Sequence, residues 1–447
     1  MKINNPTEKR FEEIKREVKE VKPKENERFI SLSPEFPIDI TEWRNIVKSN
    51  FPDLLFAAEA GLSVISQLLI DDIKNPFALV YVDVPSSGKT IVLNFFSTIK
   101  ELIYTTDNFT PASFVSHSAN RKKTDLEKND MLPQIQYRAM MIRDMAPIFA
   151  KRDEDVQAML GILIRVLDGE GLESNSGLHG KRGYVGDYLF MLLSASTPIR
   201  PKIWKVMGNL GSRLFFLNID GQEKDEKTLA NQLINSCRNK ELLCREATEE
   251  FIKTLWNKYP LGVSWDKEND DPNLMHIIAR LAKMLARLRS AINVWDESFG
   301  QKKYNHNQPI TEMPDRLNQL LYNLTRGHAL ICGRKNINRE DLKMTLRITL
   351  DSALPNRSKI FKHLIKNDGQ LATNKVMNIL KCSRPTALKL MEELSILEIV
   401  DTDGNMQDEA EIYGGRPEQK IILKEKYKWF ISKECKELFN HTGRKGL

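Results

Sequence analysis

The segment from Phe77 to Thr90 constrains the fold of this chain more than any other. Residues 77–82 form a continuous run of β-branched, aromatic and aliphatic side chains, which is typical of a strand buried on both faces of a parallel sheet. A polar loop that ends in Gly88-Lys89-Thr90 follows, and residues 90–103 then continue with helical spacing. A buried strand, a tight loop and a helix in this order predict an α/β unit.

Further apolar runs predict more strands, at residues 113–116, 139–142, 188–194 and 214–219. Helical segments, such as residues 156–167, separate these runs along the chain. Because strands and helices alternate, the sequence predicts a doubly wound α/β layer built on a parallel sheet.

The chain divides into parts of different composition. A stretch in which both signs of charge interleave precedes the first apolar helices, and the strand signal fades after Asp220. Beyond Pro355 three short helices precede two strands, at 398–401 and 419–423, which is the arrangement of a winged helix. The predicted domains are a charged helical extension (1–50), an α/β core (51–222), an all-helical region (223–352) and a winged helix (353–447).

Overall composition favours an ordinary globular protein. Hydrophobic residues make up 41% of the 447 residues and charged residues 28%, which excludes a mostly disordered chain. The apolar runs are short, so we expect no membrane span and no membrane partner. The charged N-terminus does not resemble a signal peptide, and the 5 cysteines lack metal-binding spacing. These features predict a cytoplasmic location without structural disulfides or zinc.

The loop after the first strand predicts a phosphate-binding site. Backbone N–H groups of such a loop surround phosphates, Lys89 adds a positive charge, and Thr90 offers a hydroxyl ligand for Mg²⁺. The first glycine of the G-x-x-x-x-G-K-T pattern is Asp83 here, and the alternative is an ordinary strand-to-helix turn that binds nothing. The candidate nucleotide-binding residues are Pro85, Ser86, Ser87, Gly88, Lys89 and Thr90.

A carboxylate for Mg²⁺ is expected at the end of a neighbouring strand, and Asp144 is the candidate after residues 139–142. Asp144 holds either the metal-ligand position without a catalytic Glu beside it, or the Glu position with Arg143 where the first acid normally stands. Hydrolysis would then be slow or would borrow a base such as Asp153 or Glu154. The alternative role of Asp144 is a helix cap before Met145.

The order of these motifs resembles that of AAA+ ATPases, and within them the branch that contains the minichromosome maintenance helicases. The resemblance covers roughly residues 50–352. Its further landmarks are Asp168-Gly-Glu-Gly171, the glycine-rich segment 174–184, Ser194-Ala-Ser196-Thr197-Pro198, Leu210-Gly-Ser-Arg213 and the helix that begins near Arg316.

The resemblance implies ATP and Mg²⁺ as cofactors and a homo-oligomer, in the form of a hexameric ring. It implies a β-hairpin at 174–184 that points into the pore, and Ser196 or Thr197 as the sensor 1 residue. By the same resemblance Arg213 reaches the γ-phosphate held by the neighbouring subunit, and Arg316 takes the sensor 2 position. Only about 50 residues precede the ATPase module, too few for the N-terminal domain of the replicative helicases, so we expect a divergent relative.

DNA is the expected partner because positive charge is concentrated near the C-terminus. Residues 357–389 contain eight basic residues and one acidic residue, and the whole chain has a net charge of +7. The predicted contacts are Arg384, Thr386 and Lys389 of a recognition helix, Arg416 of the wing, and His179, Lys181 and Arg182 at the hairpin tip. A winged helix that docks proteins is the alternative.

The sequence therefore favours an ATP-dependent DNA-binding motor, that is, a helicase, translocase or DNA remodeller. An ATP-gated DNA-binding regulator or loader with slow or no hydrolysis is the second hypothesis. A protein remodeller that uses the winged helix for docking is the third.

Overall fold

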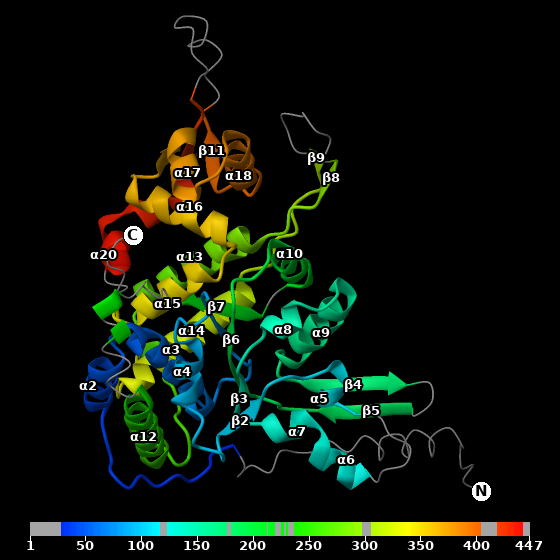
Figure 1. The fold of residues 1–447 in the computed structure, drawn as a ribbon, viewed down its shortest axis with the longest axis vertical. Coiled ribbons are helices and arrows are strands. Elements are labelled where there is room, and N and C mark those ends of the chain that lie inside the picture. The colour runs from blue at the N-terminus through cyan, green and yellow to red at the C-terminus, as the bar shows by residue number, and fades with distance from the viewer. Residues whose placement is uncertain are drawn as a thin grey trace, which may run out of the picture.

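The core of the protein is a parallel sheet of five strands. The structure, a computed structural model, describes residues 28–116, 123–176, 180–211, 213–219, 225–227, 229–230, 237–296, 305–403 and 418–440. The strands lie in the order β2 (Ile103–Thr106), β3 (Ala139–Ile142), β6 (Met191–Ser196), β1 (Ala78–Val82) and β7 (Leu214–Asn218), and each neighbouring pair is parallel. The fold is α/β, as the sequence predicts (Figure 1).

Helices cover both faces of the sheet, because alternate side chains of each strand enter different cores. Leu79 and Tyr81 of β1 pack on one face, and Val80 and Val82 on the other. The first face carries α2 (Ile40–Asn50), α3 (Leu55–Ile65), α4 (Lys89–Asn94) and α12 (Cys237–Lys258). The second carries α5 (Pro111–Phe114), α7 (Met131–Ile135), α8 (Ala146–Phe149), α9 (Asp153–Val166) and α10 (Pro201–Leu210), with α6 (Lys123–Asn129) before α7.

One apolar stretch is longer than the sequence analysis expects. The helices η1 (Pro52–Leu54), α3 and η2 (Ser66–Leu69) follow one another and form an 18-residue segment that meets the length and composition of a membrane span. The expectation that no apolar run approaches this length is therefore wrong. The fold buries 78% of this segment, with α3 packed against β1 and α14 (Asp315–Ile331), which explains why it is apolar on all sides.

A separate hairpin extends from the second face of the sheet (Figure 1). Its strands, β4 (Gly171–Ser176) and β5 (Gly180–Val185), are antiparallel, with Gly171 opposite Val185. Gly171 and Gly183 have positive φ angles, and a Cβ at either would lie 2.1 Å and 2.2 Å, respectively, from a carbonyl oxygen of the partner strand. The resemblance implies a hairpin in this interval, and the two strands are present.

The rest of the chain forms helices and two smaller sheets. α13 (Pro272–Arg289), α14 and α15 (Asp341–Asp351) follow α12, together with η3 (Lys267–Asn269) and the short pair β8 (Val294–Asp296) and β9 (Asn305–His306). Because this antiparallel pair lies within 223–352, the expectation that the region is all-helical is wrong. The C-terminal part contains α16 (Pro355–Lys366), α17 (Thr373–Leu380), α18 (Arg384–Ile396), η4 (Glu425–Ile431) and α20 (Lys433–Asn440). Its sheet has the order β10 (Gln370–Ala372), β12 (Lys420–Leu423) and β11 (Val400–Thr402).

Two predicted elements are wrong, and local chemistry explains both. Residues 113–116 form no strand, and the first two belong to helix α5, because Pro111 opens the helix and the side chains of Thr110 and Ser113 form a capping box. The helix predicted over 90–103 ends at Asn94. Aromatic, Ser and Thr side chains follow it, which are weaker helix formers, and Ile103 already begins strand β2.

Side chains from the helical region satisfy the outer backbone edge of β7. These four side chains come from the ends of α13 and α15. Arg289 donates to the Leu214 carbonyl (2.6 Å), Ser352 accepts from the Phe216 N–H (2.8 Å), Asp351 accepts from the Asn218 N–H (3.1 Å), and Arg347 donates to the Asn218 carbonyl (2.9 Å). Asp351 also accepts from the buried ammonium of Lys362 on α16 (2.7 Å), so one carboxylate joins the sheet to the C-terminal part.

Candidate functional site

The loop after β1 lies where the sheet changes direction of winding. β1 leads into α4 on one face, and the adjacent strand β6 leads into α10 on the other. Neighbouring strands whose connections leave to opposite faces form a crevice outside their carboxyl ends, the usual binding position in such sheets. The Asp83 N–H donates to the Ser196 carbonyl (3.3 Å), which brings the loop and the end of β6 together.

Lys89 holds the loop in a closed curve. Its ammonium donates to the carbonyl oxygens of Asp83 (2.8 Å) and Val84 (2.6 Å) and to the hydroxyl of Ser87 (3.2 Å). Burial lowers the pKa of Lys89 from its ordinary value, against the opposing effect of the Asp83 and Asp144 charges. The loop therefore carries a compact cation within reach of two carboxylates.

The backbone of the loop requires its glycine. Gly88 has a φ of 96°, and a Cβ there would lie 3.0 Å from the side chain of Leu54. Ser86 also has a positive φ, of 65°. Pro85, Ser86 and Thr90 are exposed, so the candidate nucleotide-binding side chains face outward around the buried stem of Lys89.

Asp144 makes the capping contact that the sequence analysis gives as its alternative role, and its role as a Mg²⁺ ligand stays a prediction. Its carboxylate is exposed and accepts a hydrogen bond from the Ala146 N–H (2.8 Å) at the start of α8, which is a capping contact. Its charge also acts on Lys89. Arg143 pairs with Asp107 (3.6 Å).

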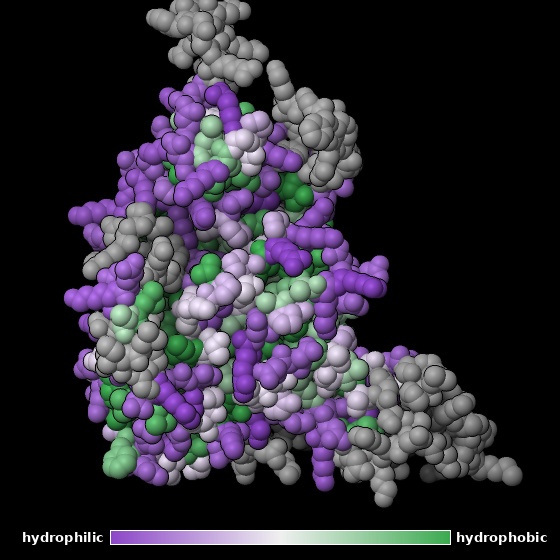
Figure 2. Space-filling view, in the orientation of Figure 1, coloured by the Kyte–Doolittle hydropathy of each residue, from purple (hydrophilic) through white to green (hydrophobic). Residues whose placement is uncertain are grey.

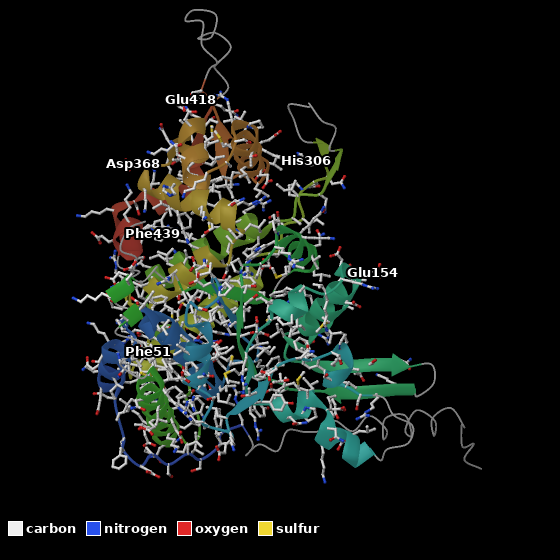
Figure 3. The ribbon with its side chains drawn as sticks, in the orientation of Figure 1. Phe51, Glu154, His306, Asp368, Glu418 and Phe439 are labelled. Carbon is white, nitrogen blue, oxygen red and sulfur yellow. The ribbon has the colours of Figure 1, made fainter. Side chains whose placement is uncertain are left out.

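The other candidates near this edge differ in accessibility. Ser196 is buried and donates to the Thr197 carbonyl (2.9 Å), whereas Thr197 is half-buried. Asp153, a candidate base, forms an ion pair with Lys202. Figure 3 shows Glu154 at the outer side of the molecule. Thr197 is thus the more accessible sensor 1 candidate, and two candidate bases lie on the outward start of α9.

Arg213 and Arg316 meet at the opposite ends of the strands from the loop after β1. Both guanidinium groups bind Oδ1 of Asp168, Arg213 at 3.3 Å. Gly169, the next residue, lies against the Lys74 carbonyl just before β1, and Arg213 itself precedes β7, so the group lies at the amino ends of the strands. A strand of five residues separates the two edges by about 16 Å.

The charges in this group shift the pKa values of Asp168 and Arg213. Burial would raise the pKa of Asp168, but the hydrogen bonds and charges of Arg316 and Arg213 lower it below its ordinary value. Burial lowers the pKa of Arg213, and the neighbouring charge of Arg316 lowers it further. The two arginines are therefore held together by one shared carboxylate.

The two basic residues of the hairpin differ in their surroundings: Arg182 is held by a buried carboxylate, and Lys181 is exposed. Arg182 binds the buried carboxylate of Asp130 (2.7 Å), which also accepts from the hydroxyl of Tyr184 (2.7 Å). Lys181 pairs with Glu173 on the exposed surface (2.8 Å). His179 lies outside the described residues. The structure therefore gives Arg182 a packing role that the sequence analysis does not anticipate.

The basic residues of the C-terminal part are not all on the surface. Arg357 is buried against the carbonyl oxygen of Ser290 (2.7 Å), and Lys362 is buried on Asp351. Thr386 and Lys389 are exposed on α18, and Arg384 is half-buried at its start. Arg416 lies outside the described residues.

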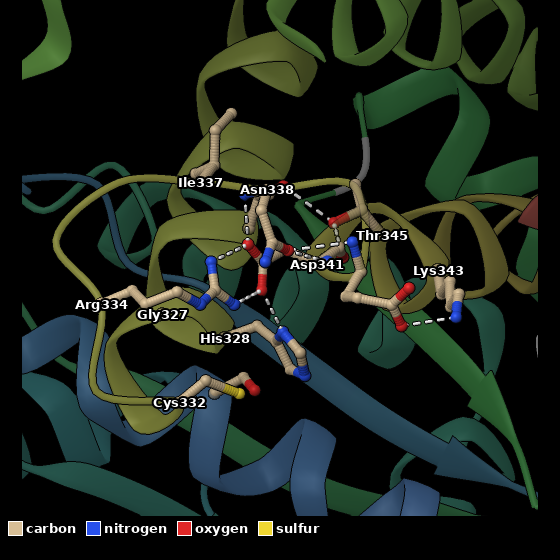
Figure 4. Close-up of polar contacts among 12 residues, drawn as sticks. Gly327, His328, Cys332, Arg334, Ile337, Asn338, Asp341, Lys343 and Thr345 are labelled. Carbon is tan, nitrogen blue, oxygen red and sulfur yellow. Dashed lines mark hydrogen bonds and ion pairs between the residues drawn. The ribbon is translucent and has the colours of Figure 1, made fainter. Parts of the chain in front are cut away.

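A buried charged cluster joins four helices, and no sequence motif predicts it (Figure 4). His328 of α14 contacts Asp341 of α15 through Nδ1 (2.5 Å) and Glu59 of α3 through Nε2 (2.9 Å). Burial alone would lower the pKa of His328, yet its hydrogen bonds to Asp341 and Glu59 raise it to about 10. Arg334 binds Asp341 (2.6 Å), and Arg44 of α2 binds Glu59.

The same cluster contains a possible donor set for a metal ion. One donor atom each from Glu59, His328 and Cys332 lie within 4.8 Å of one another. The guanidinium of Arg44, however, contacts both Glu59 and the Cys332 sulfur (3.4 Å), so a side-chain cation already occupies this place. The arrangement fits an ionic cross-link between helices better than a metal centre.

Comparison with known proteins adds no relative. A scan against protein-family models and a search of curated proteins found no match to this chain. The geometry of the loop, the arginine pair and the basic surface is the basis for assigning a function.

We expect Arg182→Ala to loosen the hairpin and Lys181→Ala to leave it intact. Removing Arg182 leaves the buried Asp130 without its charged partner, which should lower the free energy of unfolding by about 3 kcal/mol. Amide hydrogen exchange of β4 and β5, with denaturant unfolding, measures the effect. Equal exchange rates in the two variants would contradict the anchoring role.

The His328 cluster predicts a pH dependence of stability. The pKa of His328 is about 10 in the fold and near 6.5 unfolded, so its stabilisation is complete below pH 6.5 and is lost as the pH rises to 10. The difference in free energy of unfolding between wild type and His328→Gln should shrink over this range. Denaturant titrations across it test this, and a constant difference would refute it.

Proposed function

We propose that the chain is an AAA+-type ATPase that assembles head to tail and uses ATP on DNA. The observation that carries this proposal is the separation of Lys89 from the Arg213–Arg316 pair. Lys89 lies at the carboxyl ends of the strands, and the two arginines lie at their amino ends. Arginines that cannot reach their own phosphate loop are placed to reach that of another copy. ATP bound between copies would then receive both parts of its site.

The crevice at the carboxyl ends of β1 and β6 supports nucleotide binding. Lys89 would meet the β- and γ-phosphates, and the hydroxyl of Thr90 with the carboxylate of Asp144 would hold Mg²⁺. Thr197 would orient the attacking water. Mg²⁺ supplies charge neutralisation between the phosphates, and a guanidinium from the next copy would stabilise the charge that develops in phosphoryl transfer.

The finer architecture belongs to the same proposal. α12 to α15 would be the helical lid of such an ATPase. The helices α16, α17 and α18 with the strands β11 and β12 fit a winged helix, in which α18 is the recognition helix. Thr386 and Lys389 on the exposed side of α18 and Lys181 on the hairpin would contact DNA.

One observation favours the regulator or loader over the motor. Asp144 is the candidate Mg²⁺ carboxylate, and one of its oxygen atoms already caps the Ala146 N–H. With Arg143 beside it rather than a second acid, hydrolysis would be slow. An ATP-gated DNA-binding protein with little turnover is therefore the second candidate function.

Mixing two inactive variants tests the shared site. Lys89→Ala removes the loop cation, and Arg213→Ala removes the arginine, so each variant alone should lose ATPase activity. In an equal mixture about a quarter of head-to-tail interfaces combine an intact Lys89 with an intact Arg213, and about that fraction of wild-type activity should return.

Steady-state ATPase assays of the separate and mixed variants, at several protein concentrations, provide the measurement. No recovery in the mixture would contradict the shared site. Nucleotide binding without turnover in the wild type would favour the regulator over the motor.

Salt dependence of DNA binding tests the α18 surface. Lys389→Ala should weaken binding and reduce the slope of log affinity against log salt by about 1, because one phosphate contact is lost. Lys433→Ala, an exposed lysine at the start of α20, is the matched control and should leave the slope unchanged. Identical slopes for both variants, measured by fluorescence anisotropy, would argue for protein docking instead.

A further inference from the structure

An open pocket lies between α2 and α12, next to the proposed nucleotide loop. α2 contributes residues 45, 46, 49 and 50, and α12 contributes residues 243, 246, 247 and 250. Each set has the spacing of one helix face. α12 contacts the end of α4 through Glu241 and Asn94 (2.9 Å), and α2 leads into η1, whose Leu54 packs on Gly88.

Apolar side chains are unusually exposed around this pocket. Phe36 at its rim is 73% exposed, and Leu243 is 51% exposed on α12. Figure 2 shows hydrophobic residues at the surface over α2 and α12, at the lower left. Two adjacent helices with apolar faces that line a shared groove can bind a third helix.

The N-terminal segment of the chain has a matching pattern. Phe11, Ile14, Val18 and Val21 are spaced by three, four and three residues, which is the spacing of a helical stripe. Residues 9–24 contain seven basic and four acidic side chains, a balance of +3. These residues lie outside the described part of the chain, which begins at Arg28.

The charge of the pocket is also opposite to the net charge of the N-terminal segment. The charged residues that line the pocket are Glu246 and Glu250, and no basic residue lines it among the described residues. Glu250 accepts from the Phe36 N–H (2.7 Å) and pairs with Lys253 (3.5 Å), whereas Glu246 is exposed at the rim and supplies the negative charge that a ligand can meet. A basic amphipathic helix is therefore the complementary ligand for this groove.

The position of Arg28 is compatible with a helix supplied by a neighbouring copy. Arg28 donates to the carbonyl oxygens of Ile70 (2.7 Å), Asp71 (2.9 Å) and Ile73 (2.9 Å), just before β1. The described part of the chain therefore begins near the amino ends of the strands, where Arg213 also lies. In head-to-tail assembly these ends face the carboxyl ends of the strands of the next copy, beside its pocket.

We propose that residues 11–21 of one copy bind as a helix in the α2–α12 pocket of the neighbouring copy. This inference rests on the proposed head-to-tail assembly and names a second contact within it. The apolar stripe of Phe11, Ile14, Val18 and Val21 packs against Phe36 and Leu243, and flanking lysines and arginines lie near Glu246. The contact tethers each copy to the subunit whose phosphate loop it completes.

Photo-crosslinking in the full-length chain tests the contact. A photoreactive residue replaces Val18, and isotopically heavy and light chains are mixed in equal amounts. We expect crosslinks to peptides of α2 and α12, with products that join heavy to light chains. Leu243→Asp, at an exposed position, should reduce the yield about tenfold, which corresponds to about 1.4 kcal/mol.

Two further variants control the experiment. The photoreactive residue at Arg16, on the opposite side of the stripe, should give little crosslink to the pocket. Ile14→Asp with the probe at position 18 should lose the crosslink without altering the pocket itself. Equal yields from positions 16 and 18, insensitivity to both substitutions, or products within one chain only would overturn the proposal.

The outcome is independent of the ATPase test. If crosslinks between copies persist in Arg213→Ala but the mixed variants recover no activity, the docking contact is supported and the shared ATP site is refuted. Recovered activity without crosslinks between copies would refute the docking contact alone.

Discussion

The closing of the outer edge of β7 by side chains is the constraint on which the rest of the architecture depends. A terminal strand leaves its backbone groups without a partner, and such an edge pairs readily with other chains. Here arginine, serine and aspartate side chains of the helical region take the place of a sixth strand. Because Asp351 also binds Lys362, the same contacts that end the sheet fix the C-terminal part against it.

Local sequence patterns predicted the strands that bear the candidate site and missed the contacts between distant segments. β3 has the predicted bounds, and β1 begins one residue later than predicted, because continuous apolar runs flanked by polar loops define buried strands. Helix α5 was missed because its capping chemistry, rather than its apolar content, decides its structure. Local patterns give Asp168 no partner, because Arg213 and Arg316 lie 45 and 148 residues away in the sequence.

Net charge is a poor guide to the surface of this protein. Eight basic residues lie between 357 and 389, yet Arg357 and Lys362 are internal. Arg182 is likewise committed to Asp130. The sequence could place the positive charge along the chain, but burial, which depends on tertiary packing, decides how much of it a nucleic acid can meet.

The single carboxylate shared by Arg213 and Arg316 is a built-in competitor for any other anion at these two guanidinium groups. Asp168 is tethered beside both guanidinium groups, so its effective concentration there is far above that of any free anion. Inorganic phosphate or a stray nucleotide must compete with this built-in counter-ion. An anion held on a complementary protein surface also has a high effective concentration at the two guanidinium groups, and it can therefore compete with Asp168 for them.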